Sequence, residues 1–175
     1  MADTDKDVIA ITNLINLYGL VMDTQRWDMF DRLFTSDVDA DYGEGSHWRD
    51  LAKFKADFGA FHKIFDATQH LMSNHLVNVQ GDTAEACTYG NWRLIRKGLE
   101  GGDLWEGTGW YDDKLVRQQG RWLIKHRVCR ILYWSGNPLV QAGSGPDVKF
   151  NLHSTMIKGE AEAGRIGYLN AIARK

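Results

Sequence analysis

Three titratable or charged side chains interrupt apolar stretches of this 175-residue chain and could carry chemistry: Asp23, His70 and Arg127. Asp23 closes the helix-patterned stretch YGLVMD, and His70 lies in TQHLMSNHLVNV, where strand alternation places it on one face with Met72. A carboxylate that accepts a hydrogen bond from one imidazole nitrogen leaves the other nitrogen free as a base. Asp23 and His70 are therefore candidates for a general-base pair.

Each candidate also has a purely structural explanation. Asp23 could end one helix or cap the next, although Gly19, one turn earlier, removes bulk where a sheet would approach. An isolated histidine such as His70 is often a core residue with satisfied hydrogen bonds. Arg127 interrupts an apolar strand face shared with Tyr133, and a buried guanidinium needs an ion-pair partner or an anionic ligand. Asp23 is one possible partner for it.

The sequence shows no pattern typical of a metal or nucleotide site. His70 and His75 should point to opposite faces of their strand, and no carboxylate or thiolate joins either at ligand spacing. The glycine turns GEGS and GLEGGD lack the lysine and helix start of a phosphate-binding loop. Cys87 and Cys129 are expected to be reduced apolar fillers. We therefore expect no metal and no cofactor.

Composition and charge exclude several classes of partner. The chain is 43% hydrophobic, 25% charged and 11% aromatic, with a formal net charge of −2, which is typical of an ordinary globular protein. No basic cluster indicates nucleic acid or an anionic membrane. The opening MADTDKD is not followed by a signal-peptide core, and no stretch of about 18 apolar residues occurs. We expect a cytoplasmic protein without nucleic-acid or membrane partners.

Hydrophobic periodicity predicts an α+β fold. Helices are expected at about 6–22, at about 27–34 with Thr24 or Gln25 as cap, and at about 51–65, with a short strand at 37–43. The period then switches to two, and turn residues separate four strands at 69–79, 83–97, 103–117 and 121–134. These strands should form a curved antiparallel sheet with helices on one face.

The remaining residues are expected to form an extension of the same domain. Residues 1–134 make the α+β body, and 135–175 begin as a loop that precedes a helix from about 154. Gly159, Gly164 and Gly167 weaken that helix.

Three segments resemble the SnoaL-like branch of the nuclear transport factor 2 superfamily over about residues 8–134: LINLYGLVMDTQRWDMFDRLFTSDVDADYG, TQHLMSNHLVNVQGDTAEACTY and YDDKLVRQQGRWLIKHRV. Polyketide cyclases, scytalone dehydratase, hexachlorocyclohexane dehydrochlorinase and the bile-acid dehydratase belong to this group. The resemblance implies a cone-shaped, curved sheet that encloses a pocket together with three N-terminal helices. It also implies a homo-oligomer, either a trimer or a dimer, built on the exposed sheet face or on the 135–175 extension, which could instead cap the pocket.

The resemblance also implies roles for particular residues. In the lyases of this group an Asp at the place of Asp23 orients a His at the place of His70, which removes a proton during elimination. Tyr18, Tyr42 and Arg127 match positions that stabilise developing charge. The expected reaction is loss of a small leaving group from a hydrophobic cyclic molecule. The candidate pocket walls are Phe54, Phe58, Phe61, Trp92, Trp110 and Tyr133, and ordinary core packing is the more frequent explanation for each of these aromatic residues taken singly. Asn91 is a further candidate for substrate binding.

The sequence departs from individual members of the group. Scytalone dehydratase has a second His on the next strand, where this chain has Asn91, Trp92 and Arg93, and a Tyr where Met22 stands. A polyketide cyclase or isomerase using the same proton chemistry is therefore an alternative. A non-catalytic alternative is a ligand-binding or assembly domain like the small subunits of ring-hydroxylating dioxygenases. An epoxide hydrolase is disfavoured because it commonly needs an Asp–Arg–Asp arrangement.

Overall fold

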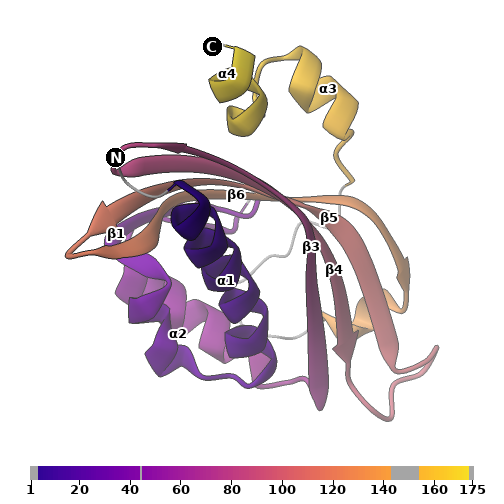
Figure 1. Ribbon diagram of the computed structural model, residues 1–175. Helices are drawn as coiled ribbons and strands as arrows, with labels where there is room; N and C mark the ends of the chain where they lie inside the picture. The colour runs from indigo at the N-terminus through magenta and orange to yellow at the C-terminus, as the bar shows by residue number, and fades with distance from the viewer. Residues whose placement is uncertain (1–3, 44, 143–153, 174–175) are drawn as a thin grey trace.

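The computed structural model describes residues 4–43, 45–142 and 154–173. Their strands form a six-stranded sheet in the order β2-β1-β6-β5-β4-β3. Figure 1 shows the sheet curving around α1 and α2, while α3 and α4 lie on its opposite side. The elements are α1 (Thr4–Asp23), the 3-10 helix η1 (Trp27–Arg32), β1 (Phe34–Asp41), β2 (His47–Trp48), α2 (Leu51–His62), β3 (Ala67–Gln80), β4 (Thr83–Ile95), β5 (Leu104–Gln118), β6 (Arg121–Gly136), the 3-10 helix η2 (Pro138–Val140), α3 (Ile157–Glu162) and α4 (Gly167–Ala173).

The long strands confirm the predicted α+β class. Strands β3 to β6 pair with their sequence neighbours in antiparallel fashion, and each end lies within two residues of the predicted boundary. β1 adds in parallel to β6, so the sheet is mixed but mostly antiparallel. Successive side chains of a strand point to opposite faces of the sheet, so every second one faces the helices. This alternation is why the strands could be predicted from the sequence.

Helix α1 confirms the predicted N-terminal helix and its buried face. Ile11, Ile15, Tyr18 and Met22 recur every three or four residues and are at most 1% exposed. The helix packs on β3 at Gly19, where an added Cβ would lie 3.0 Å from the carbonyl oxygen of His70. The glycine therefore allows the close approach that brings the end of α1 to the start of β3.

The segment after α1 differs from the prediction. The expected helix at 27–34 is a 3-10 helix that ends at Arg32, and Phe34 already begins β1, which ends at Asp41. Neither Thr24 nor Gln25 is the cap, because Arg26 holds that position without a side-chain hydrogen bond. Apolar residues at this spacing suit either a helix or a strand, and the parallel pairing with β6 decides for the strand.

Helix α2 begins at the predicted residue and ends three residues early, at His62. Asp50 caps it by accepting a 2.7 Å hydrogen bond from the backbone N–H of Lys53. The chain then turns into β3, so the stripe of Phe54, Phe58 and Phe61 is helical while Phe65, also buried, lies beyond the helix.

The C-terminal extension forms two short helices instead of one. Gly164 has a φ of +67° between α3 and α4, which breaks the helix at one of the three glycines that weakened it. Ile166 packs with Trp110 and Cys87 on the convex side of the sheet. Helices therefore cover both faces, which corrects the expectation that they share one face.

Candidate active site

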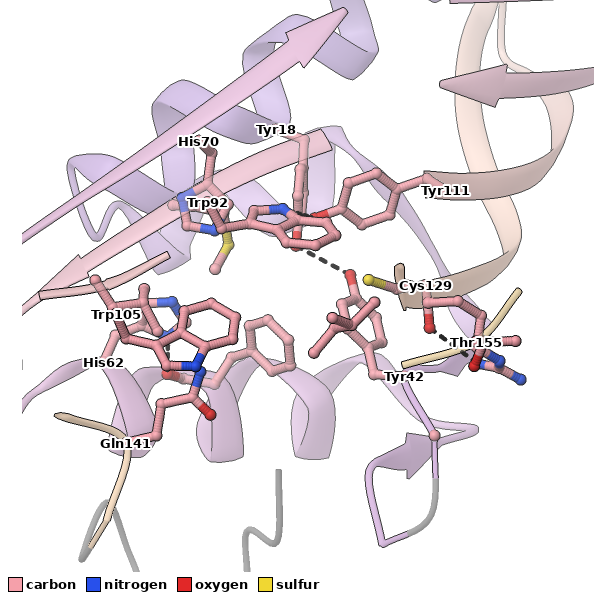
Figure 2. A pocket seen from close by; sticks show the side chains of 16 residues that line it. Tyr18, Tyr42, His62, His70, Trp92, Trp105, Tyr111, Cys129, Gln141 and Thr155 are labelled. Atoms are coloured by element: carbon pink, nitrogen blue, oxygen red, sulfur yellow. Dashed lines mark hydrogen bonds between the residues drawn. The ribbon is translucent and has the colours of Figure 1, made fainter. Parts of the chain in front are cut away.

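A pocket of about 290 Å³ opens between the concave side of the sheet and the helices α1 and α2. Figure 2 shows aromatic rings forming most of its walls, with His62 and His70 on one side and Tyr42 on the other. Four of the expected site residues besides His70 line it, namely Tyr18, Tyr42, Phe58 and Trp92. Its size suits a small organic molecule.

Asp23 and His70 meet at the wall of this pocket, as the sequence predicted. Asp23 Oδ1 lies 2.7 Å from His70 Nδ1, and Asp23 Oδ2 accepts the backbone N–H of His70 at 2.9 Å. Thr68 Oγ1 donates to the same carboxylate at 2.9 Å. The His70 side chain is 7% exposed. The end of α1 and the start of β3 thus hold one imidazole in a fixed orientation.

The electrostatics of this pair determine the His70 tautomer. Burial raises the pKa of Asp23, but the hydrogen bonds from His70 and Thr68 outweigh it and leave that pKa below its usual range. Asp23 is therefore a carboxylate at neutral pH and accepts the proton on His70 Nδ1. The Nε2 nitrogen of His70, a residue that lines the pocket, then carries a lone pair and can act as a base.

Phenolic hydroxyls form the second polar group of the pocket. The hydroxyl oxygens of Tyr18 and Tyr42 lie 3.0 Å apart, and Tyr111 accepts a 2.7 Å hydrogen bond from Trp92 Nε1. Burial raises the pKa of Tyr18 to about 12, and it raises the pKa values of Tyr42 and Tyr111 well above the usual value. The phenols therefore stay protonated. One hydroxyl of the Tyr18 and Tyr42 pair donates to the other, and the O–H of the accepting hydroxyl is not used in this bond.

Arg127 does not line the pocket, which corrects the predicted contact with substrate. Its guanidinium is fully buried and donates to both oxygens of Asp113 at 2.8 and 2.7 Å. It lies 4.3 Å from the ring centroid of Tyr18 and 4.4 Å from that of Tyr111. The register of β5 and β6 places Asp113 directly opposite Arg127, so Asp113 and not Asp23 is its partner. Arg127 therefore packs against the rings of Tyr18 and Tyr111 on the side away from the pocket.

Tyr133 is also misplaced by the prediction, because β6 contains a bulge. Gly109 pairs with Ile131 and Thr108 pairs with Tyr133, so Leu132 is an extra residue in β6. A one-residue insertion reverses the alternation beyond it. Tyr133 consequently lies outside the pocket and is 62% exposed.

Four further expected wall residues lie elsewhere. Phe54 and Phe61 are buried in the core, where the ring of Phe54 stacks on Trp48 with centroids 5.0 Å apart. Trp110 occupies the convex face of β5, beneath the C-terminal helices. Asn91 is exposed on β4, since its neighbour Trp92 takes the inward position. Aromatic character alone did not distinguish a pocket wall from the core or from the opposite face.

Eleven lining residues were not predicted, and among them are His62, Trp105, Tyr111, Cys129 and Arg130. His62 follows Phe58 by four residues, and this helical spacing places both on one face. Trp105 and Tyr111 are an even number of positions apart on β5, so their side chains lie on the same face of the strand. Knowing that one of them faces the pocket would therefore have predicted the other. Arg130 carried no signal of this kind in the sequence.

Arg130 brings little net charge to the pocket because Asp41 neutralises it. Its Nη2 donates to Asp41 Oδ2 at 2.6 Å, and its Nη1 donates to Oδ1 at 3.2 Å. Burial raises the pKa of Asp41, but the hydrogen bond from Arg130 outweighs it and leaves that pKa below its usual range. The pair therefore stays ionised and internally compensated.

His75 lies on the same side of β3 as His70, contrary to the expectation of opposite faces. A bulge after Ser73 shifts the alternation, and His75 Nε2 contacts Asn16 of α1 at 3.2 Å while Nδ1 contacts Thr88 at 3.1 Å. Within the described residues, no group of three or more His, Cys, Asp or Glu side chains is placed to hold a metal ion. The described helices also include none that is long and apolar enough to span a bilayer.

Comparison with known proteins identifies the family. The SnoaL-like domain model matches residues 5–128. An uncharacterised protein of Mycobacterium tuberculosis, Rv2910c, is 32% identical over 123 residues, which are 70% of this chain and 83% of that protein.

Two solved structures share the fold. A candidate scytalone dehydratase from Novosphingobium aromaticivorans superposes with a TM-score of 0.73 at 18% identity, covering 89% of this chain and 97% of the other. A hexachlorocyclohexane dehydrochlorinase, LinA Type2, gives a TM-score of 0.67 at 14% identity, covering 77% and 91%. Identities this low establish the fold and not the activity. By fold and by sequence, the chain belongs to the SnoaL-like domain family.

Proposed function

We propose that this protein is a cofactor-independent lyase of the dehydratase or dehydrohalogenase type, which removes a small leaving group from a hydrophobic cyclic molecule. The observation that carries the proposal is the 2.7 Å contact between Asp23 Oδ1 and His70 Nδ1 at the wall of an aromatic-lined pocket. A carboxylate-oriented imidazole is a suitable base for removing a proton from carbon.

The proposed reaction needs only the residues of this pocket. His70 Nε2 takes a proton from the carbon next to a carbonyl group, and the electrons of the C–H bond pass into the carbonyl to form an enolate. A phenolic hydroxyl of the Tyr18 and Tyr42 pair stabilises the enolate oxygen. When the carbonyl reforms, the bond from the adjacent carbon to the leaving group breaks and a C=C bond forms. A hydroxyl departs as water after taking the proton from the His70 imidazolium, and a halide departs as the anion. The Asp23 carboxylate stabilises the imidazolium formed in the first step.

The charges around the pocket favour a neutral substrate. Arg130 is paired with Asp41, and Arg127 is paired with Asp113 behind the tyrosines. A substrate carboxylate or phosphate would therefore meet no free cation among the described lining residues. The aromatic walls supply apolar surface instead, as expected for a cyclic hydrophobic compound.

The structural similarity to proteins described as a candidate scytalone dehydratase and a dehydrochlorinase supports elimination over other chemistries. Isomerisation is the closest alternative, because the same base and phenols would return the proton to another carbon when no leaving group is adjacent. Analysis of the products separates the two, since elimination changes the mass of the substrate and isomerisation does not.

The proposal is tested by incubating the protein with cyclic hydroxyketones and haloketones and measuring product mass and deuterium uptake at the carbon next to the carbonyl. We expect His70→Ala and Asp23→Asn to lower both by about 10²–10⁴-fold. His126→Ala is the matched control, because His126 lies 3.9 Å from Asp39 and outside the pocket. Undiminished turnover in His70→Ala, or strong destabilisation by both variants with no activity on any compound, would favour a structural role for the pair.

A further inference from the structure

A second imidazole, that of His62, lines the pocket beside His70. It is the last residue of α2, and its Nδ1 lies 2.8 Å from the carbonyl oxygen of Phe58, one helical turn earlier. The ring centroids of His62 and His70 are 6.3 Å apart, and Figure 2 shows both rings on the same side of the cavity. The elimination chemistry described above gives His62 no role.

The Nδ1 partners of the two histidines predict different chemistry. A carbonyl oxygen only accepts hydrogen bonds, so His62 Nδ1 must carry the proton and Nε2 must carry the lone pair. His70 has the same tautomer, but its partner is the carboxylate of Asp23. A carboxylate stabilises an imidazolium, whereas a neutral carbonyl does so far less. His62 is thus suited to accept a hydrogen bond and poorly suited to take a proton.

The surroundings of His62 reinforce this difference. Burial lowers the pKa of its imidazole to about 3, and the neighbouring His70 contributes in the same direction. The ring is packed against Trp27 and Phe58, with centroids 5.1 and 5.5 Å away, which fixes its orientation. The imidazole is therefore neutral at neutral pH, and its Nε2 has no hydrogen-bond partner among the described residues.

We infer that His62 is a specificity-determining residue whose Nε2 accepts a hydrogen bond from a hydroxyl group that the substrate keeps throughout the reaction. The inference rests on the proposed function and narrows its substrate to a neutral cyclic ketone with an additional hydroxyl group. A departing hydroxyl needs a proton donor, and a lone pair that accepts its hydrogen would hinder its loss. The hydroxyl bound by His62 is therefore a retained group that orients the ring toward His70.

Two variants separate the acceptor from the packing of the ring. His62→Phe keeps an aromatic ring against Trp27 and Phe58 but removes both nitrogens. His62→Asn places an amide N–H where Nδ1 stands, so it can keep the bond to the Phe58 carbonyl while losing the acceptor at Nε2. His62→Phe breaks the bond to the Phe58 carbonyl, whereas His62→Asn can keep it. A loss of hydroxyl binding in both variants is therefore assigned to the missing Nε2 acceptor.

The experiment measures the dissociation constants of a hydroxyindanone, the corresponding methoxyindanone and unsubstituted indanone, at several ring positions. We expect the parent protein to bind at least one hydroxyindanone about tenfold more tightly than its methoxy counterpart, the typical effect of one hydrogen bond to a buried acceptor. Both His62 variants should reduce this preference to about one. The methoxy compounds keep the oxygen and lack the donor, so they control for size and polarity.

Nitrogen-15 NMR of the imidazoles distinguishes hydroxyl binding from a purely structural role of His62, because a structural role would leave the Nε2 resonance unchanged on ligand addition. The free protein should show His62 as the neutral tautomer protonated on Nδ1, and the Nε2 resonance should shift with the hydroxyindanone and not with the methoxyindanone. A proton on Nε2 in the free protein, or a hydroxyl preference that survives in both variants, overturns the inference and leaves elimination by His70 standing. Turnover that persists in His70→Ala overturns the proposed function and leaves the hydroxyl-binding result standing.

Discussion

His70 is bound twice by the carboxylate of Asp23, once through its ring and once through its own backbone. Nδ1 lies 2.7 Å from Oδ1, and the backbone N–H donates to Oδ2 at 2.9 Å. Because both carboxylate oxygens contact the same residue, rotation of either side chain breaks at least one of these bonds. The position of the imidazole is thereby tied to the geometry of the strand that carries it.

Asp23→Asn should alter the pH dependence of stability as well as activity. The pKa of Asp23 is lowered in the folded protein. Its contribution to the free energy of unfolding is therefore present above the ordinary carboxyl value of 3.8 and is lost as the pH falls through the lower, folded value. Thermal midpoints of parent and variant should accordingly differ most near neutral pH and converge in acid. If the thermal midpoints of parent and variant differed by the same amount at every pH, the folded protein would not stabilise the Asp23 carboxylate.

Gly19→Ala should lower turnover through the position of α1. The added Cβ would lie 3.0 Å from the backbone oxygen of His70 and 3.3 Å from Met72 Cγ, so the helix must move away from β3. Such displacement would lengthen the contact between Asp23 and His70 and lower kcat by about tenfold or more.

Gly159→Ala is the matched control for this substitution. A Cβ at residue 159 of α3 meets no atom within 4 Å, so the variant should gain helix propensity worth about 1 kcal/mol without a change in kcat. Equal effects of the two alanines on kcat would contradict the assigned role of Gly19.

Removing one member of the buried pair Arg127 and Asp113 should be costly. Both side chains are at most 1% exposed, and a single deletion leaves an uncompensated buried charge. Asp113→Leu or Arg127→Met should each lower the free energy of unfolding by about 3–5 kcal/mol. The double variant should be more stable than either single variant, as measured by urea denaturation. A strictly additive loss would show that the pairing contributes nothing.

Asp112→Asn should stabilise the protein at neutral pH. Burial, together with Asp113, raises the pKa of Asp112 to about 6, while the backbone N–H of Gly167 opposes the shift by donating to Oδ2 at 2.8 Å. A raised carboxyl pKa means that folding favours the protonated form, so stability falls as the pH rises from 3.8 through about 6.

The asparagine keeps an acceptor for Gly167 and carries no charge. Its expected gain is on the order of 2–3 kcal/mol above pH 6, vanishing near pH 4, in thermal or urea unfolding. A gain that does not depend on pH would mean that the charge of Asp112 is not the cause.

The sequence alone determined the first helix, the four long strands and the pairing of Asp23 with His70. Helix α1 and the strands β3 to β6 could be recognised because their apolar residues repeat with the helical period or with the period of a pleated strand. The pairing of Asp23 with His70 could be anticipated because one ends the first helix, the other begins the first long strand, and Gly19 permits their approach.

Only the tertiary structure decided which residues face the pocket. The bulge at Leu132 turned Tyr133 outward, and the C-terminal helices buried Trp110 on the far side of the sheet. Strand register gave Arg127 its partner Asp113. Periodicity specifies that a residue is buried and not which neighbour it meets, because alternation is local whereas bulges, register and covering helices are set by contacts between distant segments. The same reason explains why His62 was not predicted as a pocket residue. It lies beside His70 only because β3, which carries His70, folds back next to the end of α2.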